Sequence, residues 1–140
     1  MENPKLTVGN GNAVIMVDDN EEDRFIARHC FQKAGLNNSW LEFTGGLQAL
    51  KHLDSIESGQ NPMPAVALLD INMPHMNGFE LVEAIRARSY FIDLSIVVML
   101  TSSQNATDVQ QAKKLGVTKY ITKPIDLDEY MRFFVSLAST

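Results

Sequence analysis

The sequence predicts an α/β fold in which one parallel sheet of five strands is covered by five helices. Apolar runs of strand length alternate along the chain with longer segments whose apolar residues recur at helical spacing. Three of the apolar runs, residues 14–17, 66–69 and 96–100, are continuous, which is typical of parallel strands buried on both faces. We therefore expect these three strands at the centre of the sheet and the more polar strands at its two sides.

Five strands and five helices are expected to alternate along the chain. The expected strands cover the segments 13–18, 39–43, 65–70, 95–101 and 119–122. The expected helices cover the segments 21–34, 46–58, 78–88, 105–115 and 126–138. Asn20 and Asp126 favour helix starts because their side-chain oxygens can accept hydrogen bonds from free backbone N–H groups. Gly35 and Gly116 favour helix ends, where the backbone often turns left-handed.

The last helix carries apolar residues at helical spacing, which predicts a face buried against the rest of the domain. The residues expected on that face are Leu127, Tyr130, Met131, Phe134 and Leu137. Phe133 falls outside this stripe, and an exposed Phe133 would indicate a surface for a protein partner.

The chain has 140 residues, a length typical of one domain. Residues 1–12 are polar and include Gly9 and Gly11, so we expect a flexible lead-in before a folded domain of residues 13–140. A hydrophobic share of 45% and a charged share of 21% are typical of globular proteins and argue against disorder. At this length we expect no output domain on the same chain.

The charge balance limits the classes of partner. A net charge of −5 and a pI near 5.1 argue against direct binding to nucleic acid or to an anionic membrane, because both require a basic surface. The sequence has neither an apolar run of the ~20 residues that cross a bilayer nor an apolar signal core at its start. With a single cysteine, Cys30, expected in the core, these features predict a cytoplasmic protein.

Polar side chains stand at the ends of four of the expected strands. In parallel sheets, ligands bind at the carboxyl ends of the strands, where such side chains meet. The residues expected there are Asp18, Asp19, Asp70, Thr101 and Lys123. Three carboxylates in one place repel one another unless a cation joins them, and oxygen ligands of this kind suit Mg²⁺. A carboxylate can also act as a nucleophile and accept a phosphoryl group, and Asp70 has the neighbours for that role.

Four segments at this end of the predicted sheet resemble the receiver domains of two-component response regulators. They are residues 17–20 (VDDN), 69–78 (LDINMPHMNG), 100–102 (LTS) and 123–124 (KP). The resemblance to this CheY-like family extends from residue 13 to the C-terminus and indicates a stand-alone receiver domain. It implies a flavodoxin-like, doubly wound five-stranded sheet in the strand order 2-1-3-4-5 with five helices.

The resemblance assigns roles to the acidic residues. Asp70 would be the phosphoacceptor. Asp19 and Asp70 would bind Mg²⁺ directly, together with the backbone carbonyl of Asn72, and Asp18 would act mainly through metal-bound water. The protein would then be a phosphoacceptor switch that takes part in its own phosphotransfer and autodephosphorylation, and not an enzyme with a separate substrate. Asn72 and Ser103 occupy the positions that tune how fast water removes the phosphoryl group.

The resemblance also implies a conformational switch. Lys123 would pair with the phosphoryl group, and the hydroxyl of Thr101 would move inward to hydrogen-bond it. In the family this movement is coupled to an aromatic ring on the fifth strand, here Tyr120, whose burial would report activation. The family usually has a cis peptide at the position of Lys123–Pro124, and the energy cost of a cis bond is low only before proline.

The implied partners are proteins. A histidine kinase or a histidine phosphotransfer protein would supply the phosphoryl group, and a downstream target protein would read the phosphorylated state. The contact with the target, or with a second copy of the chain in a homodimer, is expected on the face formed by the fourth helix, the fifth strand and the fifth helix.

Three other functions fit parts of the sequence. A receiver fold can dock a partner regardless of phosphorylation, although the complete set of five site residues argues against this. A phosphohydrolase with an aspartyl nucleophile commonly has a second Asp two residues after the first, where this chain has Asn72. A nucleotide-binding protein of the Rossmann type is disfavoured because the glycine-rich stretch at Gly9 precedes the first strand instead of following it.

Overall fold

Five parallel strands form one sheet in the order β2-β1-β3-β4-β5 in the computed structural model, which describes residues 12–100, 106–122 and 126–138. The strands are β1 (Val14–Val17), β2 (Trp40–Phe43), β3 (Val66–Asp70), β4 (Ile96–Leu100) and β5 (Lys119–Thr122). Each neighbouring pair is parallel, so all five carboxyl ends lie at the same end of the sheet. The predicted fold class and strand order are confirmed.

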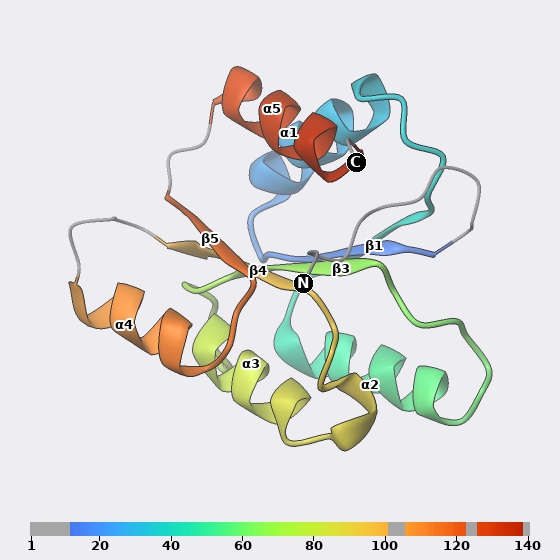
Figure 1. The fold of residues 1–140 in the computed structure, drawn as a ribbon, viewed down its shortest axis with the longest axis vertical. Coiled ribbons are helices and arrows are strands. Elements are labelled where there is room, and N and C mark those ends of the chain that lie inside the picture. Colours follow the sequence, from blue (N-terminus) through green and yellow to red (C-terminus); the bar gives the residue numbers. More distant parts are fainter. Residues whose placement is uncertain (1–11, 101–105, 123–125, 139–140) are drawn as a thin grey trace.

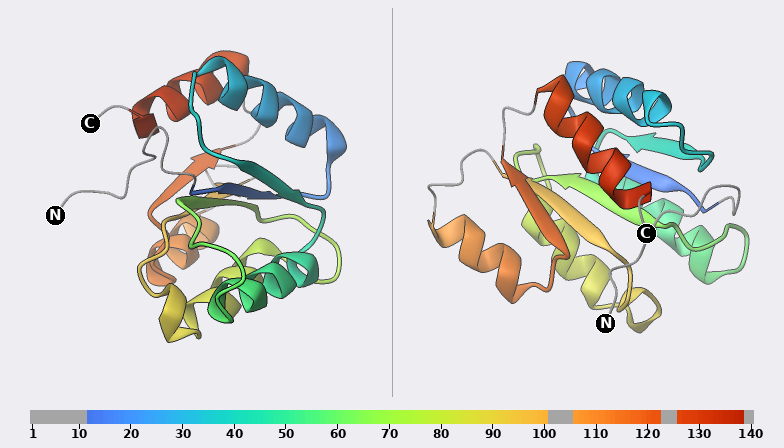
Figure 2. Two further views of the ribbon diagram at one scale, coloured as in Figure 1. Left: turned by 90° about the vertical axis from the view of Figure 1, so that its right-hand side faces the viewer. Right: turned by 45° about the horizontal axis from the view of Figure 1, so that its top comes forward.

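Helices cover both faces of the sheet, as Figures 1 and 2 show. One face carries α1 (Glu21–Lys33) and α5 (Leu127–Ala138). The other face carries the remaining elements, which are α2 (Gly46–Glu57), α3 (Gly78–Arg86), α4 (Ala106–Lys114) and the short 3₁₀ helix η1 (Ser89–Phe91). Every predicted helix is present, with ends within two residues of the prediction.

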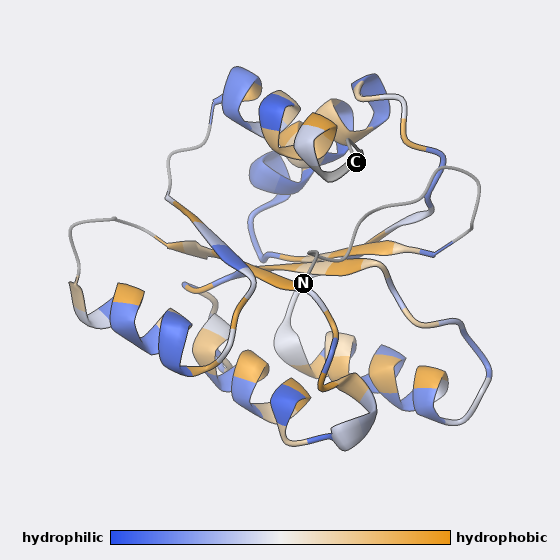
Figure 3. Ribbon diagram, in the orientation of Figure 1, coloured by the Kyte–Doolittle hydropathy of each residue, from blue (hydrophilic) through white to orange (hydrophobic). Residues whose placement is uncertain are grey.

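The three continuous apolar runs form the centre of the sheet. Every residue of β1, β3 and β4 is buried, whereas β2 and β5 are half-buried apart from the exposed Lys119. Figure 3 shows hydrophobic central strands between helices in which hydrophobic and hydrophilic residues are mixed. Burial on both faces removes the need for alternating polar residues, which explains the pattern of the sequence.

Alternate residues of the central strands face two separate core layers. The layer under α2, α3 and α4 is mainly aliphatic and includes Ile15, Leu69 and Val98. The layer under α1 and α5 contains an aromatic group in which the ring centroids of Phe31 and Trp40 lie 4.9 Å apart. These two layers hold the strands rigid, so the loops that leave their carboxyl ends have fixed starting points.

The predicted buried face of α5 is correct in part. Tyr130 and Phe134 are buried and Met131 is half-buried, but Leu127 is 53% exposed and Phe133 is only 5% exposed. The expectation that Phe133 lies outside the buried face is therefore wrong. The nitrogen Nζ of Lys119 on β5 lies 5.4 Å from the centroid of the Phe133 ring, so this side chain packs between α5 and β5. The side chain of Leu137 lies outside the described residues.

The predictions about Cys30 and about membrane-spanning segments can also be compared with the structure. Cys30 is 1% exposed and belongs to the core between the sheet and α1, as predicted. Among the helices of the described segments, none combines the length and the hydropathy that a bilayer crossing needs. The cytoplasmic location stays a prediction.

Candidate metal and phosphoacceptor site

Asp18 follows the last residue of β1 and lies in the interior of the domain. Its side chain is fully buried, and its backbone N–H donates to the carbonyl of Phe43 at 3.1 Å. Its Oδ1 accepts a hydrogen bond from the backbone N–H of Asn20 at 2.9 Å. Asn20 caps α1, because its Oδ1 accepts from the backbone N–H of Asp23 at 2.8 Å. The chain therefore turns sharply after Asp18, and Asp19 becomes exposed at the surface.

Asp70 is the last residue of β3 and is 3% exposed. The chain after it is held tightly, because the backbone N–H of Ile71 donates to the carbonyl of Met99 and the N–H of Gly78 donates to the carbonyl of Ile71. A methyl group added at Gly78 would lie 2.8 Å from the Cα of Ile71, so only glycine lets α3 begin this close to the strand. The position of the Asp70 carboxylate is thus set by close packing of the backbone.

The loop between β3 and α3 is fixed at several points. Asn77 and Glu80 form reciprocal hydrogen bonds between side chain and backbone, both of 2.9 Å, which close the start of α3. His75 adopts a φ of 69°, the left-handed region that is uncommon for residues other than glycine. Asn72, the predicted donor of a backbone carbonyl, is exposed in this loop two residues after Asp70.

Three carboxylates meet at the carboxyl ends of β1 and β3. One carboxylate oxygen from each of Asp18, Asp19 and Asp70 lies within 4.8 Å of the other two. Two of the three side chains are buried, so water screens their repulsion poorly. A divalent cation with a preference for oxygen ligands would neutralise this charge, and the donor set fits Mg²⁺ better than a metal that prefers nitrogen or sulfur.

Two predicted site residues, Thr101 and Lys123, lie outside the described residues, as do Ser103 and Pro124. The strands that lead to them are described. Leu100 and Thr122 end β4 and β5 and are partners in the register of the two strands. The predicted meeting of five side chains is therefore confirmed for the three aspartates and stays a prediction for the other two residues.

Tyr120, the predicted switch residue, lies on β5 opposite Val98 of β4. It is half-buried and packs against the core layer under α2, α3 and α4. An aromatic ring with this partial burial has room to become more or less exposed, as the predicted switch requires. The role itself stays a prediction.

One residue at this site was not predicted from the sequence. Arg24 in the first turns of α1 donates from Nη1 to the backbone carbonyl of Asp18 at 2.8 Å. It also donates from Nε to Oε1 of Glu42 on β2 at 3.2 Å. The sequence contains no signal for this pairing, because the two side chains come from different elements and are brought together only by the sheet order.

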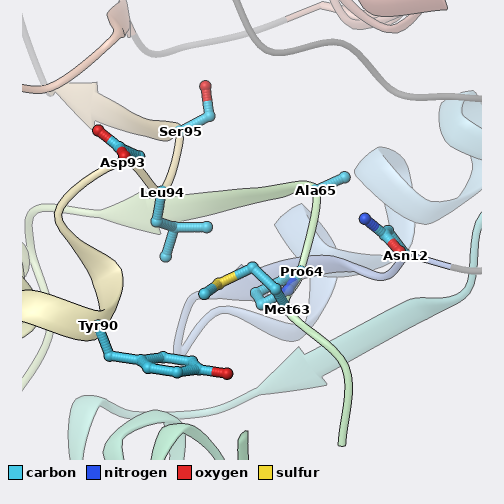
Figure 4. Close-up of a pocket in the computed structure, with 8 residues that line it drawn as sticks. All are labelled: Asn12, Met63, Pro64, Ala65, Tyr90, Asp93, Leu94 and Ser95. Carbon is cyan, nitrogen blue, oxygen red and sulfur yellow. The ribbon is translucent and has the colours of Figure 1, made fainter. Parts of the chain in front are cut away.

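A hollow of about 210 Å³ lies at the opposite end of the sheet from the three carboxylates (Figure 4). It is lined by Asn12, Met63, Pro64, Ala65, Tyr90, Asp93, Leu94 and Ser95. These residues precede β1, β3 and β4, so they lie at the amino ends of the strands. The side chains of Met63, Pro64, Leu94 and Tyr90 give the hollow an apolar lining, and it lacks the grouped carboxylates of the carboxyl end.

Comparison with known proteins gives one consistent result. A family model described as the response regulator receiver domain matches residues 14–133. Chemotaxis protein CheY1 of Helicobacter pylori is 34% identical over 111 residues, which cover 79% of this chain and 84% of that protein. The sensor histidine kinase CheAY of the same bacterium is also 34% identical over 111 residues, but these residues cover only 13% of the kinase.

Solved structures agree with the sequence comparison. The crystal structure of the Mn²⁺-bound form of response regulator Rcp1 has a TM-score of 0.76 and is 25% identical, covering 89% of this chain and 90% of that one. The shared fold, the family match over most of the chain and the acidic group at the strand ends all point the same way. The chain belongs to the response regulator receiver domain family, whose members are aspartate-phosphorylated switches of two-component signalling.

Proposed function

We propose that Asp70 is the phosphoacceptor of this receiver domain. The observation that carries the proposal is the meeting of the Asp18, Asp19 and Asp70 carboxylates within 4.8 Å of one another. Asp70 is the last residue of the central strand β3, and the close packing of Ile71 and Gly78 behind it fixes its position. A nucleophile needs such a defined position to attack phosphorus in line with the leaving group.

The acidic group would hold Mg²⁺ through Asp19, Asp70 and the backbone carbonyl of Asn72, with Asp18 acting through metal-bound water. The cation, when bound, would neutralise negative charge on the phosphoryl oxygens. The structure of Rcp1 was determined with Mn²⁺, which shares the preference of Mg²⁺ for carboxylate and carbonyl oxygens. This likeness supports a divalent cation at the acidic group of the present chain.

The transfer reaction would move a phosphoryl group from a histidine of a kinase or phosphotransfer protein to Asp70. A carboxylate oxygen of Asp70 forms a bond to phosphorus while the bond between phosphorus and the histidine nitrogen breaks, and the imidazole leaves. Lys123 would pair with the phosphoryl oxygens and Thr101 would donate its hydroxyl to one of them. The domain would then promote its own dephosphorylation by water.

A downstream protein would recognise the phosphorylated state at the face formed by α4, β5 and α5. A groove of about 460 Å³ lies between β5 and α5 on this face, and its lining includes Lys119, Tyr120, Arg132 and Phe133. Inward movement of Thr101 would bury Tyr120 and change the shape of the groove, which a downstream protein would read. A homodimer through the same face is the alternative output.

Acetyl phosphate tests the proposal directly. We expect the chain to gain one phosphoryl group in the presence of Mg²⁺, to lose this reaction in EDTA, and to lose the adduct in Asp70→Asn, all measured by intact-protein mass spectrometry. Asp93→Asn, which removes an exposed carboxylate at the other end of the sheet, is the matched control and should react like the wild type. An adduct that persists in Asp70→Asn, or no adduct with either acetyl phosphate or a phosphorylated histidine donor, would contradict the proposal.

A further inference from the structure

The side chain of Arg24 links the acidic site to the neighbouring strand β2. Its Nη1 donates to the backbone carbonyl of Asp18 at 2.8 Å, and its Nε donates to Oε1 of Glu42 at 3.2 Å. The side chain is 14% exposed, and its backbone N–H is fixed in the first turn of α1 by the carbonyl of Asn20. The guanidinium is therefore held in one orientation, unlike an arginine on an open surface.

Glu42 is in turn held by other groups. Its Oε2 accepts a hydrogen bond from Nε1 of Trp40 at 2.7 Å and pairs with Arg28 on the next turn of α1. Burial raises the pKa of Glu42, but the hydrogen bonds from Trp40, Arg28 and Arg24 outweigh burial and leave the pKa below its usual range. Glu42 is thus ionised at neutral pH and provides a fixed anchor for Arg24.

Arg24 contacts the peptide unit that joins Asp18 and Asp19, two of the aspartates of the site. The backbone N–H of Asp18 donates to the carbonyl of Phe43, and the backbone carbonyl of Asp18 accepts a hydrogen bond from Arg24. Because a peptide unit is planar, the direction of the Asp18 carbonyl also fixes the plane in which the chain enters Asp19. The direction of the Asp19 side chain from its Cα depends on that plane. Asp19 is exposed and belongs to neither core layer, so packing against the core does not fix its direction.

We propose that Arg24 is a positioning residue of the acidic site, which orients the Asp18–Asp19 peptide so that the two carboxylates can share one divalent cation with Asp70. Glu42 acts one step further away by holding Arg24. The inference rests on the proposed function, because it requires that the acidic group binds Mg²⁺. Groups that orient metal ligands typically affect metal affinity by about 10-fold or more when they are removed.

The charge of Arg24 and its geometry predict opposite effects of its removal on the affinity for Mg²⁺. If the positive charge of Arg24 were its main effect, its removal would tighten Mg²⁺ binding, because a cation near the site repels Mg²⁺. If its geometry matters, its removal weakens binding. Arg24→Lys separates the two effects, since lysine keeps the charge but replaces the planar guanidinium, which reaches two acceptors, by a single ammonium.

Mg²⁺ titrations by isothermal calorimetry test the inference on the full chain. We expect Arg24→Lys and Arg24→Gln to bind Mg²⁺ about 10-fold more weakly than the wild type. Arg28→Gln is the matched control. Arg28 also pairs with Glu42 from α1, but its other contact is with the ring of Phe25, and Trp40 still donates to Glu42 in this variant. We expect its affinity to stay within about twofold of the wild type. With acetyl phosphate, the Mg²⁺ concentration for half-maximal phosphorylation of Arg24→Lys should rise by a similar factor, and excess Mg²⁺ should restore most of the rate.

Each other outcome overturns the inference. Wild-type affinity in Arg24→Lys would show that geometry is unimportant, tighter binding in Arg24→Gln would show that charge dominates, and an equal loss in Arg28→Gln would indicate general destabilisation. If circular dichroism shows that Arg24→Lys is unfolded, Glu42→Gln gives the same test, because it loosens Arg24 while leaving it in place, and wild-type Mg²⁺ affinity there would also overturn the inference. A wild-type chain that binds no Mg²⁺ would instead contradict the proposed function, before any variant is compared.

Discussion

The two ends of the central sheet differ in the charge of their buried polar side chains. At the amino end the polar groups satisfy one another, as where the buried hydroxyl of Ser95 donates to the hydroxyl of Thr118 at 3.2 Å. At the carboxyl end Asp18 and Asp70 are buried with the same charge, beside a third carboxylate. The first arrangement adds to the stability of the folded chain, whereas the second carries a repulsion between like charges that a bound cation would relieve.

This difference separates residues that maintain the fold from residues that serve the site. Positions where a sequence departs from the rules of stability are expected to be functional, because the fold alone gives no reason to keep them. Substitutions at the two ends should therefore change stability with opposite signs. They should also differ in whether Mg²⁺ alters the result.

The largest effect is expected at Arg86, which ties three segments together at the amino end. Its Nη1 donates to the carbonyls of Phe91 and Ile92 at 2.9 and 3.2 Å, and its Nη2 donates to the carbonyl of Gly116 at 2.9 Å. Burial lowers the pKa of Arg86, although Asp93 opposes this, and a guanidinium stays charged at neutral pH. Arg86→Ala should lower the free energy of unfolding by about 2–3 kcal/mol, because three hydrogen bonds from a charged group to backbone carbonyls are lost.

Urea unfolding in the presence and absence of Mg²⁺ measures this effect. The loss of stability in Arg86→Ala should be the same in both conditions, and the Mg²⁺ affinity of the folded variant should stay within about twofold of the wild type. A variant that folds normally but binds Mg²⁺ much more weakly would show that the two ends of the sheet are coupled, and the comparison would fail.

An effect of the opposite sign is expected at Asp18. Asp18→Asn removes one of the three negative charges but keeps an oxygen that can accept from the backbone N–H of Asn20. In EDTA the variant should be more stable than the wild type by about 1 kcal/mol, because repulsion between the carboxylates is relieved. Mg²⁺ at about 100 times its dissociation constant should stabilise the wild type by about 2.7 kcal/mol and the variant by less, which reverses their order.

Thermal or urea unfolding with EDTA and with Mg²⁺ checks both halves of this prediction. Glu83→Gln, which removes an exposed charge on α3, serves as the control and should leave the response to Mg²⁺ unchanged. If Asp18→Asn is less stable than the wild type in EDTA, the carboxylates do not destabilise the apo fold, and the contrast between the two ends is wrong.

The fold was predictable because burial determines which positions of the sequence are apolar. Strands buried on both faces must be apolar throughout, and this placed β1, β3 and β4 at the centre. Strand ends were less well predicted, as at Ser95, which was expected in the fourth strand but lies just before β4. Such end effects depend on neighbouring elements and have no local pattern.

The site was predictable only where topology alone decides the position. The three aspartates follow strand ends, so a parallel sheet brings them together whatever the details of packing. Arg24 depends on a contact with a strand that is 18 residues away in the sequence. The burial of Phe133 depends on the rotation of α5 relative to β5, which helical spacing does not determine. The cap of α3 was visible in principle, because Asn77 and Glu80 have the spacing of a capping box.

The smallest effect is expected at Arg88, which also belongs to the amino end but lies at the surface. Its Nη1 pairs with Asp54 at 2.8 Å and with Glu57 at 3.0 Å, and both acidic side chains are largely open to water. Arg88→Ala should therefore lower the free energy of unfolding by only about 0.5 kcal/mol, and the loss should disappear in about 1 M NaCl, where exposed charges are screened. Urea unfolding at low and high salt measures this, with Arg86→Ala as the contrast, because Arg86 is more deeply buried than Arg88 and its hydrogen bonds to carbonyls should depend less on salt. A salt-resistant loss at Arg88 as large as that at Arg86 would mean that burial does not decide which polar contacts stabilise the amino end.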